Sequence, residues 1–403
     1  MQNIRKAAMA VHFISVDDFD TFDPAFKYFT TKEREILVSR LHKEIYPMTY
    51  LPRLIESQNG EKVLLYFIGL FLDSSTIYHH LQTKNIEPMR NLVHKAADKA
   101  IELNCSVLGL GGYTSIVTRN GKSIETDRIA VTTGNAHTVQ KGLEAIKKEA
   151  EDKQIEIHRA TAGVVGATGN IGSIYSLMIA HSVENLIIFG RPGREQTLRG
   201  IAGEIIESII EKIGRALKNN TKINGIAAKI ANTETVKKAI QNNLQLSLAE
   251  LYLALQKEME DDSPIKISTN LYELKKCDII LTASNSSAPI IFSEMIDDSK
   301  PVIINDISVP LDTDGSVHKM KNVSVIKGGI VKLPLNQQHS FESLMLEKGN
   351  VFACIAETIL MGLENMTDHF SYGKITKEQV EKMGRIADYH GFNLGRSKIE
   401  DSY

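Results

Sequence analysis

The sequence is poor in cysteine, and it lacks an excess of charge of one sign. Its three cysteines, Cys105, Cys277 and Cys354, are too few and too far apart for a disulfide framework, and they match no paired metal-ligand spacing. We therefore expect no metal site and a reducing, cytoplasmic setting. The formal net charge of −2 leaves no broad basic surface for nucleic acid.

Long apolar runs are also missing. The most apolar window, residues 63–72, is too short to cross a bilayer and fits a buried strand instead. The first residues include Arg5 and Lys6, but Asp17 and Asp18 follow too soon for the hydrophobic stretch of a signal peptide. These features predict a soluble protein that is not exported, and they leave peripheral contact with a membrane open.

What the chain does have is enough length and apolar content for more than one core. Its 403 residues, 42% of them hydrophobic, favour two or three domains of the α/β class. We assign residues 1–160 to an N-terminal α/β domain and residues 161–332 to a Rossmann-type domain with a doubly wound parallel sheet. Residues 333–403 form a helical segment too small to fold alone, which we expect to pack on the first domain and complete a substrate domain with it.

Apolar periodicity places the main elements. Strands are expected at residues 11–15, 63–72, 108–113, 162–166, 278–282, 302–305 and 323–326. A further strand ends at Phe189, and the last sheet should end near Val331. Helices are expected at residues 31–43, 87–103, 138–153, 194–218 and 234–260, and again from residue 347 onward. The stretch 194–262 is longer than a simple crossover needs, and we interpret it as an elaboration that forms either a dimer surface or a lid.

The strongest motif is the glycine-rich run GATGNIG at residues 166–172, which lies between a strand and a helix. Its three glycines suit a tight turn, a close approach of the backbone to a pyrophosphate, and close contact of helix with sheet. The helix should begin near Asn170, so that its N–H groups and positive dipole end face the phosphates. A glycine turn without a ligand is the alternative, but the strand–turn–helix context favours a dinucleotide site. Its predicted residues are Gly166, Thr168, Gly169, Asn170, Ile171 and Gly172.

The next strand indicates which dinucleotide binds. It runs into FGRPGR at residues 189–194, with no carboxylate before Glu195 to bind the ribose hydroxyls of NADH. Arg191 and Arg194 suit a 2′-phosphate, because a guanidinium pairs bidentately with phosphate. We therefore predict NADPH as the cofactor. Further along, Ala283 and Ser284 follow a strand, where they lie either against the cofactor or in a purely structural turn.

Cys354 is the candidate nucleophile. If Asn350 caps the last helical segment, the thiol lies in the first turn, where the helix dipole favours a thiolate. A thiolate can attack a thioester, and hydride transfer to the resulting acyl-enzyme gives an aldehyde. Free cysteines are often buried structural residues, and this interpretation stays open for Cys354 and is preferred for Cys105 and Cys277. His137 is a candidate acid or base, with a capping role as its alternative.

Six sequence blocks resemble the long-chain acyl-(acyl-carrier-protein) reductase family, which makes fatty aldehydes from acyl thioesters with NADPH. The likeness runs from about residue 9 to residue 395. The blocks are LGLGGYTSI at 108–116, TTGNAHT at 132–138, VGATGNIGS at 165–173, GGIV at 328–331, FACIAE at 352–357 and YHGF at 389–392. The resemblance implies that Cys354 carries the acyl group and that the glycine loop holds NADPH.

The same resemblance implies an acyl pocket built by the first and last segments. Residues 63–72, the helix of Cys354, and Tyr113, Thr114 and Ser115 would line it. Backbone N–H groups near residues 111–115 are candidate oxyanion donors, with His137 as the proton donor. Magnesium would act as an activator, although no carboxylate cluster demands a tight site. The implied partners are acyl-carrier protein or acyl-CoA as donor, an aldehyde-consuming enzyme and a second copy of the chain.

Two features depart from the reductase pattern and keep other functions open. The stretch 194–262 is longer than the family's crossover, and INDISVP at residues 304–310 replaces a glycine-rich turn. The DISVP portion suggests a glutamyl-tRNA reductase relative, but that family's cysteine lies in the N-terminal domain and Cys105 does not match its motif. A non-catalytic NADP(H)-binding module that regulates a partner through the long helices is the third interpretation.

Overall fold

The computed structural model describes residues 4–21, 23–241, 245–337 and 346–395, which form two compact units. Among these residues, unit 1 runs up to Lys141 and resumes at Gly329, and unit 2 is Gly142–Gly328. The described residues from Gly329 onward therefore belong to the same unit as the N-terminal residues. The divisions fall earlier than the expected 160/161 and 332/333, because helix α5 (Asn135–Asp152) contains the first division and the chain after Gly329 already belongs to unit 1.

Unit 1 is built on a six-stranded mixed sheet. Its strands are β1 (Arg5–Phe13), β2 (Met48–Thr49), β3 (Arg53–Glu56), β4 (Lys62–Asp73), β5 (Val107–Leu110) and β6 (Ala130–Thr132), in the order β2-β4-β1-β5-β6 with β3 also paired to β4. The pairs β1–β4, β1–β5 and β5–β6 are parallel, whereas β2 and β3 run antiparallel to β4. The buried strand expected at 63–72 is confirmed, but the one expected at 11–15 lies at Arg5–Phe13.

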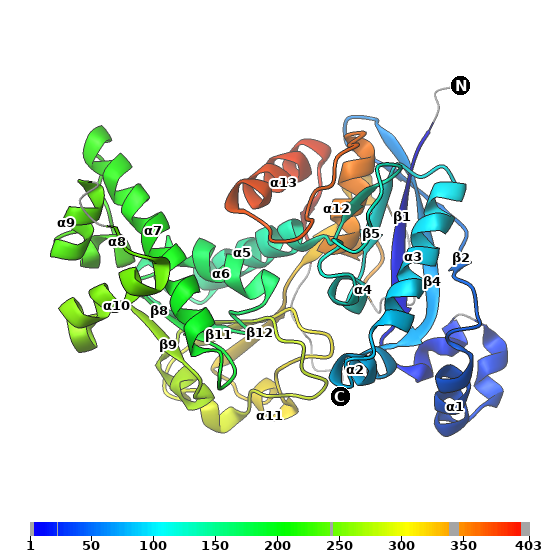
Figure 1. Ribbon diagram of the computed structural model, residues 1–403, viewed down its shortest axis with the longest axis horizontal. Coiled ribbons are helices and arrows are strands. Elements are labelled where there is room, and N and C mark those ends of the chain that lie inside the picture. The colour runs from blue at the N-terminus through cyan, green and yellow to red at the C-terminus, as the bar shows by residue number, and fades with distance from the viewer. Residues whose placement is uncertain (1–3, 22, 242–244, 338–345, 396–403) are drawn as a thin grey trace. The chain divides into compact units, whose positions relative to one another are not determined.

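Alternating side chains of β1 divide unit 1 into two layers. Ala8 and Ala10 belong to a core shared with the buried face of α3 (Glu87–Glu102). The opposite face of the sheet contacts α12 (Ala353–Leu363), and glycines permit this close approach. A Cβ on Gly109 would lie less than 3.0 Å from Thr358, and one on Gly362 would lie 2.8 Å from Val63. The helix of Cys354 is thus seated directly on the sheet (Figure 1).

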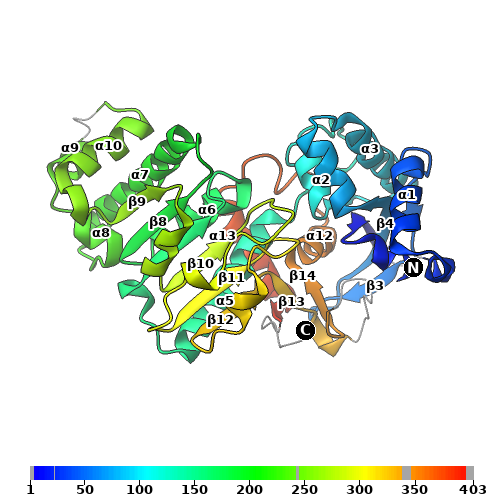
Figure 2. The ribbon, with the colours of Figure 1, turned by 90° about the horizontal axis from the view of Figure 1, so that it is seen from below.

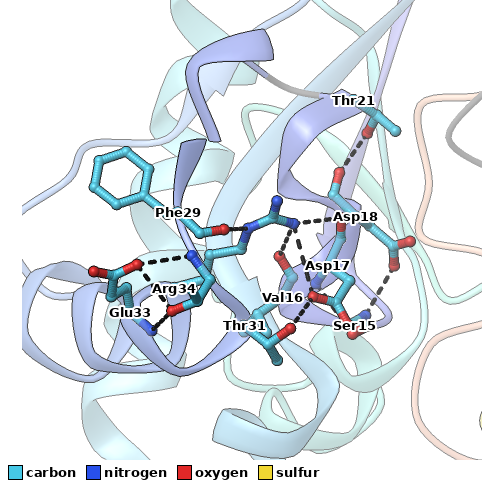
Figure 3. Close-up of polar contacts among 10 residues, drawn as sticks. Ser15, Val16, Asp17, Asp18, Thr21, Phe29, Thr31, Glu33 and Arg34 are labelled. Carbon is cyan, nitrogen blue, oxygen red and sulfur yellow. Dashed lines mark hydrogen bonds and ion pairs between the residues drawn. The ribbon is translucent and has the colours of Figure 1, made fainter. Parts of the chain in front are cut away.

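Short helices pack on the carboxyl ends of β1 and β4. They are η1 (Val16–Thr21), η2 (Pro24–Tyr28), α1 (Thr31–Leu41) and α2 (Ser74–Gln82). Arg34 of α1 is buried, and its guanidinium donates to the carbonyl oxygens of Phe29 at 3.1 Å and Asp17 at 2.9 Å (Figure 3). The ring of Phe19 stacks on the ring of Phe71, and the two ring centroids are 4.9 Å apart. These contacts join η1, η2 and α1 to the sheet.

Unit 2 contains a six-stranded, fully parallel sheet. Its strands are β7 (Thr161–Val165), β8 (Asn185–Phe189), β9 (Ile265–Ser268), β10 (Ile279–Thr282), β11 (Val302–Asp306) and β12 (Val323–Lys327), in the order β12-β11-β10-β7-β8-β9 (Figure 2). Counted from β7, this is the 3-2-1-4-5-6 order of the Rossmann fold, with its switch point between β7 and β10. The predicted fold class is confirmed.

The long crossover from β8 to β9 is helical. It contains α7 (Glu195–Asn219), α8 (Gly225–Ile230), α9 (Glu234–Ile240), α10 (Leu248–Met259) and η4 (Glu260–Asp262). The single helix expected at 234–260 is wrong, because α10 starts anew at a capping box of Ser247 and Glu250. Gly203 of α7 lets α10 approach closely, since a Cβ there would lie less than 3.0 Å from Leu248. The elaboration therefore packs on its own domain through α7. Strand β9 was not predicted from the sequence.

The described residues after Gly328 belong to unit 1. Strands β13 (Ile330–Lys332), β14 (Asn350–Phe352) and β15 (Asn393–Leu394) form a small antiparallel sheet, with α12 following β14 and α13 (Lys377–His390) preceding β15. Val331 was expected at the end of the nucleotide-binding sheet, but it pairs with Val351 and Leu394 instead. The remaining short elements are α4 (Tyr113–Val117), η3 (Ile157–Arg159), α6 (Asn170–Ala180), η5 (Leu271–Lys276), η6 (Ser293–Met295), α11 (Gly315–His318) and η7 (Pro334–Asn336). No helix in the described ranges has both the length and the apolar character needed to cross a bilayer.

Candidate functional site

The glycine loop joins β7 to α6 at the switch point of the parallel sheet. Gly166 has φ of +76°, a left-handed conformation that L side chains rarely adopt. A Cβ on Gly166 would lie 2.6 Å from the carbonyl oxygen of Ala283, and one on Gly172 would lie less than 3.0 Å from the carbonyl oxygen of Gly166. Because the clashing atoms are backbone, no side chain can be accommodated at either position.

The start of α6 suits an anion. The helix begins at Asn170, as predicted, and its N-cap residue Gly169 has no side chain to accept from the first turn. The first N–H groups of a helix have no intrahelical acceptor, and its dipole is positive at this end. Thr168 and Gly169 are exposed, and Asn170 and Ile171 are half-buried. A bare helix start beside glycines that exclude side chains fits the pyrophosphate of a dinucleotide.

Arg191 and Arg194 are both exposed in the loop that follows β8. The Arg191 guanidinium donates to the side-chain oxygen of Asn285 at 2.6 Å, which links this loop to the one after β10. Arg194 is the N-cap residue of α7, and its N–H donates to the carbonyl oxygen of Arg191 at 3.1 Å. Both residues thus lie beyond the carboxyl end of the second Rossmann strand, where the adenosine ribose is bound in such domains.

The predicted residues Ala283 and Ser284 lie beside the glycine loop, in the turn after β10. The carbonyl group of Ala283 is the atom group that a side chain on Gly166 would meet. The Ser284 hydroxyl donates to Oδ1 of Asp312 at 2.5 Å, and its N–H donates to Oδ2 of the same carboxylate at 3.1 Å. Asp312 was not predicted from the sequence. In the sequence, Asp312 is the second of two acids in the short segment DISVPLD at residues 306–312, which follows an apolar run.

The first of those acids, Asp306, is also fully buried. Its carboxylate accepts from the N–H of Ser308 at 3.0 Å and from the N–H and hydroxyl of Thr313 at 2.9 and 2.8 Å. Burial first, and then the nearby charge of Asp312, raise the pKa of Asp306 to about 6. Residues 304–310 therefore lead into a loop organised by two buried acids.

Cys354 is the second residue of α12 and is half-buried. The expected cap is wrong: Asn350 belongs to β14, and Phe352 is the N-cap residue. Gly134, with φ of +72°, packs directly against the cysteine, since a Cβ there would lie less than 3.0 Å from the Cα and Cβ atoms of Cys354. The TTGNAHT and FACIAE blocks, which are more than 200 residues apart in sequence, thus meet in space.

The expectation of a resting thiolate at Cys354 is also wrong. Burial raises the pKa of the Cys354 thiol to about 12, and the charge of Glu357 acts in the same direction. Hydrogen bonds from backbone N–H groups at the helix start lower the pKa, as the helix argument requires, but burial outweighs them. The cysteine is a neutral thiol near neutral pH.

Glu357 links the FACIAE block to the TTGNAHT block through hydrogen bonds. It is fully buried on α12, and its carboxyl group accepts from the Thr132 hydroxyl, from the N–H of His137 at 2.8 Å, and from Ser371. Burial raises the pKa of Glu357 above its usual range. No role was assigned to Glu357 from the sequence, although it lies in one of the family blocks. An acid within an otherwise apolar helix was the signal that could have identified it.

His137 has a different environment from the one predicted. It is fully buried, and neither ring nitrogen has a hydrogen-bond partner among the described residues. Burial, followed by the charge of Lys141, lowers the pKa of His137 to about 3. The imidazole is therefore neutral near neutral pH, which does not support its role as a proton donor in the imidazolium form. Its main-chain N–H instead holds Glu357.

Tyr113, Thr114 and Ser115 are buried in α4, immediately after β5. The hydroxyl groups of Thr114 and Ser115 donate to the carbonyl oxygen three residues earlier, both at 2.8 Å. Their N–H groups donate to the same carbonyl oxygens, and the N–H of Tyr113 donates to His12 Nε2 at 3.0 Å. The N–H groups of these three residues are engaged within the protein, so their contacts do not support a role as oxyanion donors.

The other two cysteines are buried, as predicted. Cys105 is 5% exposed and Cys277 is 0% exposed, and burial raises the pKa of each to about 12. Cys277 also packs against Gly163 of β7, where a Cβ would lie 2.7 Å from its sulfur. Both fit structural roles. In the described part of the chain, no group of three or more His, Cys, Asp or Glu side chains is arranged to hold a metal ion.

The strand order and the loop at the switch point define unit 2 as a dinucleotide-binding domain of the dehydrogenase type. In agreement with this class, the profile of the shikimate / quinate 5-dehydrogenase family matches residues 223–327, which include β9 to β12. The match covers less than half of the chain. It therefore identifies a related domain and does not place the whole chain in that family.

Two curated relatives match much more of the chain. The long-chain acyl-[acyl-carrier-protein] reductase of Synechococcus elongatus is 23% identical over 341 residues, which are 80% of this chain and 82% of that protein. The aminotransferase PigE of a Serratia species is 23% identical over 309 residues, 75% of this chain. The chain corresponds to only 29% of the length of PigE. Together with the dehydrogenase-type domain, the distant relationship to the reductase indicates an NAD(P)-dependent oxidoreductase.

Two solved structures align along the chain with low scores. They are D-lactate dehydrogenase with NAD+ from Lactobacillus jensenii (11% identity, TM-score 0.24, 96% of this chain and 100% of that one) and the D-isomer specific 2-hydroxyacid dehydrogenase from Lactobacillus delbrueckii ssp. bulgaricus (10% identity, TM-score 0.23, 98% and 100%). Similarity at this level carries no argument, and the fold assignment rests on strand order and register.

Proposed function

We propose that this protein uses NADPH to reduce a long-chain acyl thioester of acyl-carrier protein or coenzyme A to a fatty aldehyde, through an acyl group held on Cys354. The observation that carries the proposal is the setting of this cysteine. Of the three cysteines, Cys354 alone keeps partial exposure, and it lies at the start of a helix where two distant sequence blocks meet. The similarity to an acyl-[acyl-carrier-protein] reductase over most of both chains supports the choice of substrate class.

In the proposed reaction, the sulfur of Cys354 bonds to the thioester carbonyl carbon as the bond from that carbon to the donor sulfur breaks. The proton of the Cys354 thiol ends on the departing donor thiolate. NADPH, when bound at the glycine loop, supplies the hydride that reduces the acyl carbon. The bond from that carbon to Cys354 then breaks, and the sulfur keeps the electron pair and takes up a proton. Because the resting thiol is neutral, its proton must leave during the attack.

The acyl-enzyme can be tested without the cofactor. We expect intact-mass spectrometry after incubation with a long-chain acyl-CoA, in the absence of NADPH, to find one added acyl group per chain. Peptide mapping should place the adduct on Cys354. A stable protein that gains no acyl group would contradict the proposal and favour the regulatory-module alternative. An adduct on another residue would contradict the assigned nucleophile.

The preference for NADPH should depend on Arg191. A charge-assisted hydrogen bond to phosphate is worth about 1.5–3 kcal/mol, so Arg191→Ala should weaken NADPH binding by roughly 10- to 100-fold. Binding of NADH, which lacks the 2′-phosphate, should change little. Titration of both nucleotides by fluorescence measures the two dissociation constants. Arg215→Ala, an exposed arginine farther along α7, is the matched control and should leave both unchanged. An equal loss for NADPH and NADH would contradict the assignment.

A further inference from the structure

We propose that Asp312 is a positioning residue of the dinucleotide site, which holds the turn after β10 against the glycine loop. The inference rests on the proposed binding of NADPH to that loop. Asp312 lies in the loop after β11 and is fully buried. Its carboxylate accepts hydrogen bonds from side chains and a backbone group that belong to two different strand ends.

The carboxylate collects donors from both loops. Its Oδ2 accepts from the hydroxyl of Thr282, the last residue of β10, and from the Ser308 hydroxyl at 2.6 Å. Ser284 donates twice, from its N–H to Oδ2 at 3.1 Å and from its hydroxyl to Oδ1 at 2.5 Å. The carbonyl oxygen of Asp312 also accepts from the N–H groups of residues 290 and 291, at 2.8 and 2.9 Å. One side chain therefore fixes both sides of the Thr282–Ser284 turn.

This turn is in direct contact with the glycine loop. The carbonyl oxygen of Ala283 lies 2.6 Å from where a Cβ of Gly166 would be, and the nitrogen of Ser284 lies 3.2 Å from the same point. A Cβ on Gly169 would also be 3.9 Å from the Ala283 oxygen. Any shift of the turn therefore changes the position of the backbone atoms that pack against the glycine loop, where the proposed pyrophosphate site lies. The link from Asp312 to the glycine loop passes through Ser284 and its neighbour Ala283.

The carboxylate of Asp312 accepts on both oxygens, and hydrogen bonds to a charged acceptor are stronger than those to a neutral one. The N–H of Ser284 can only donate, and it is shared between Oδ2 of Asp312 and the hydroxyl oxygen of Ser308, each at 3.1 Å. An asparagine at position 312 has a single acceptor oxygen, and its NH2 group would face at least one of these donors. The substitution keeps the shape of the side chain and breaks the pattern of donors and acceptors. Loss of the charge and of one acceptor oxygen weakens the hydrogen bonds that hold Ser284, which favours movement of the turn.

Asp312→Asn is therefore expected to weaken NADPH binding by at least about 10-fold, measured by nucleotide fluorescence. The KM for NADPH should rise by the same factor, while kcat at saturating NADPH stays within about twofold. Acyl transfer from acyl-CoA to Cys354 without NADPH should proceed at the wild-type rate. A role in stability alone would lower the fraction of active protein, and so kcat, without raising the KM of the molecules that remain folded.

Asp314→Asn is the matched control. Asp314 lies two residues away and accepts from the N–H of Ser316 at 2.8 Å as the cap of α11, without contact to the turn in the described hydrogen bonds. Its NADPH affinity should equal that of the wild type. Ser308→Ala removes one donor to Asp312 and one of the two acceptors of the Ser284 N–H, and it keeps the carboxylate. It should fold even if Asp312→Asn does not, and should weaken NADPH binding by roughly 3- to 10-fold.

The outcomes separate this inference from the proposed function. Wild-type NADPH affinity in folded Asp312→Asn, or in Ser308→Ala where the first variant does not fold, would overturn the positioning role and leave the reductase proposal intact. An equal loss in Asp314→Asn would also overturn it, because the effect would then be general to this loop. Wild-type protein that binds no NADPH would instead defeat the proposed function on which the inference rests.

Discussion

Replacing Cys354 with serine should abolish aldehyde formation and leave NADPH binding unchanged. A serine hydroxyl is nearly the same size as the thiol but is a far weaker nucleophile without a dedicated base, so we expect the rate to fall by at least about 10³-fold. Aldehyde production from acyl-CoA and NADPH measures the loss, and nucleotide fluorescence measures binding. The half-buried setting of Cys354 at the start of its helix should tolerate the change with little loss of stability.

Cys105→Ala provides the control for this experiment. Cys105 is buried in the core behind β5, so its truncation should lower the free energy of unfolding by about 1 kcal/mol and leave activity per folded molecule unchanged. Aldehyde formation retained in Cys354→Ser at more than a few per cent of the wild-type rate would contradict the covalent mechanism. It would point to direct reduction of the bound thioester.

The features predicted well from sequence are those that neighbouring residues determine. The turn at Gly166, the start of α6 at Asn170 and the parallel strands around them follow from local rules for glycine, helix ends and apolar runs. The capping box that starts α10 at Ser247 was equally readable, yet the helix was predicted as continuous from residue 234. The helical periodicity of the stretch as a whole concealed this new start.

The features missed or mistaken depend on distant contacts. The pKa of Cys354 is set by burial against the sheet, which helix position alone does not reveal. Asn350 pairs with Lys332 in an antiparallel strand and so cannot cap the helix, because strand partners far apart in sequence are not visible from one segment. The role of Asp312 likewise depends on donors from two separate loops.

Gly134→Ala should disrupt the site of Cys354 strongly, although it adds a single methyl group. The added Cβ would lie less than 3.0 Å from the Cα, Cβ and carbonyl oxygen of Cys354, and backbone atoms cannot rotate away. Gly134 also has φ of +72°, which an alanine adopts at a cost of about 1–2 kcal/mol. With the steric conflict added, we expect the free energy of unfolding to fall by about 2–5 kcal/mol. Chemical denaturation measures this change.

The same substitution should slow acyl transfer in the molecules that stay folded. Relief of the clash requires Cys354 or the Gly134 loop to move, and a displacement of about 1 Å at a reacting group can cost roughly 10²-fold in rate. Gly60→Ala is the matched control in the same unit, because Gly60 has φ of +88° and a Cβ there would meet nothing within 4 Å. It should lose only the conformational cost of about 1–2 kcal/mol and keep the wild-type rate of Cys354 acylation. If folded Gly134→Ala were acylated as fast as the wild type, the contact between the two blocks would be structural only, and the proposed placement of the nucleophile by Gly134 would be wrong.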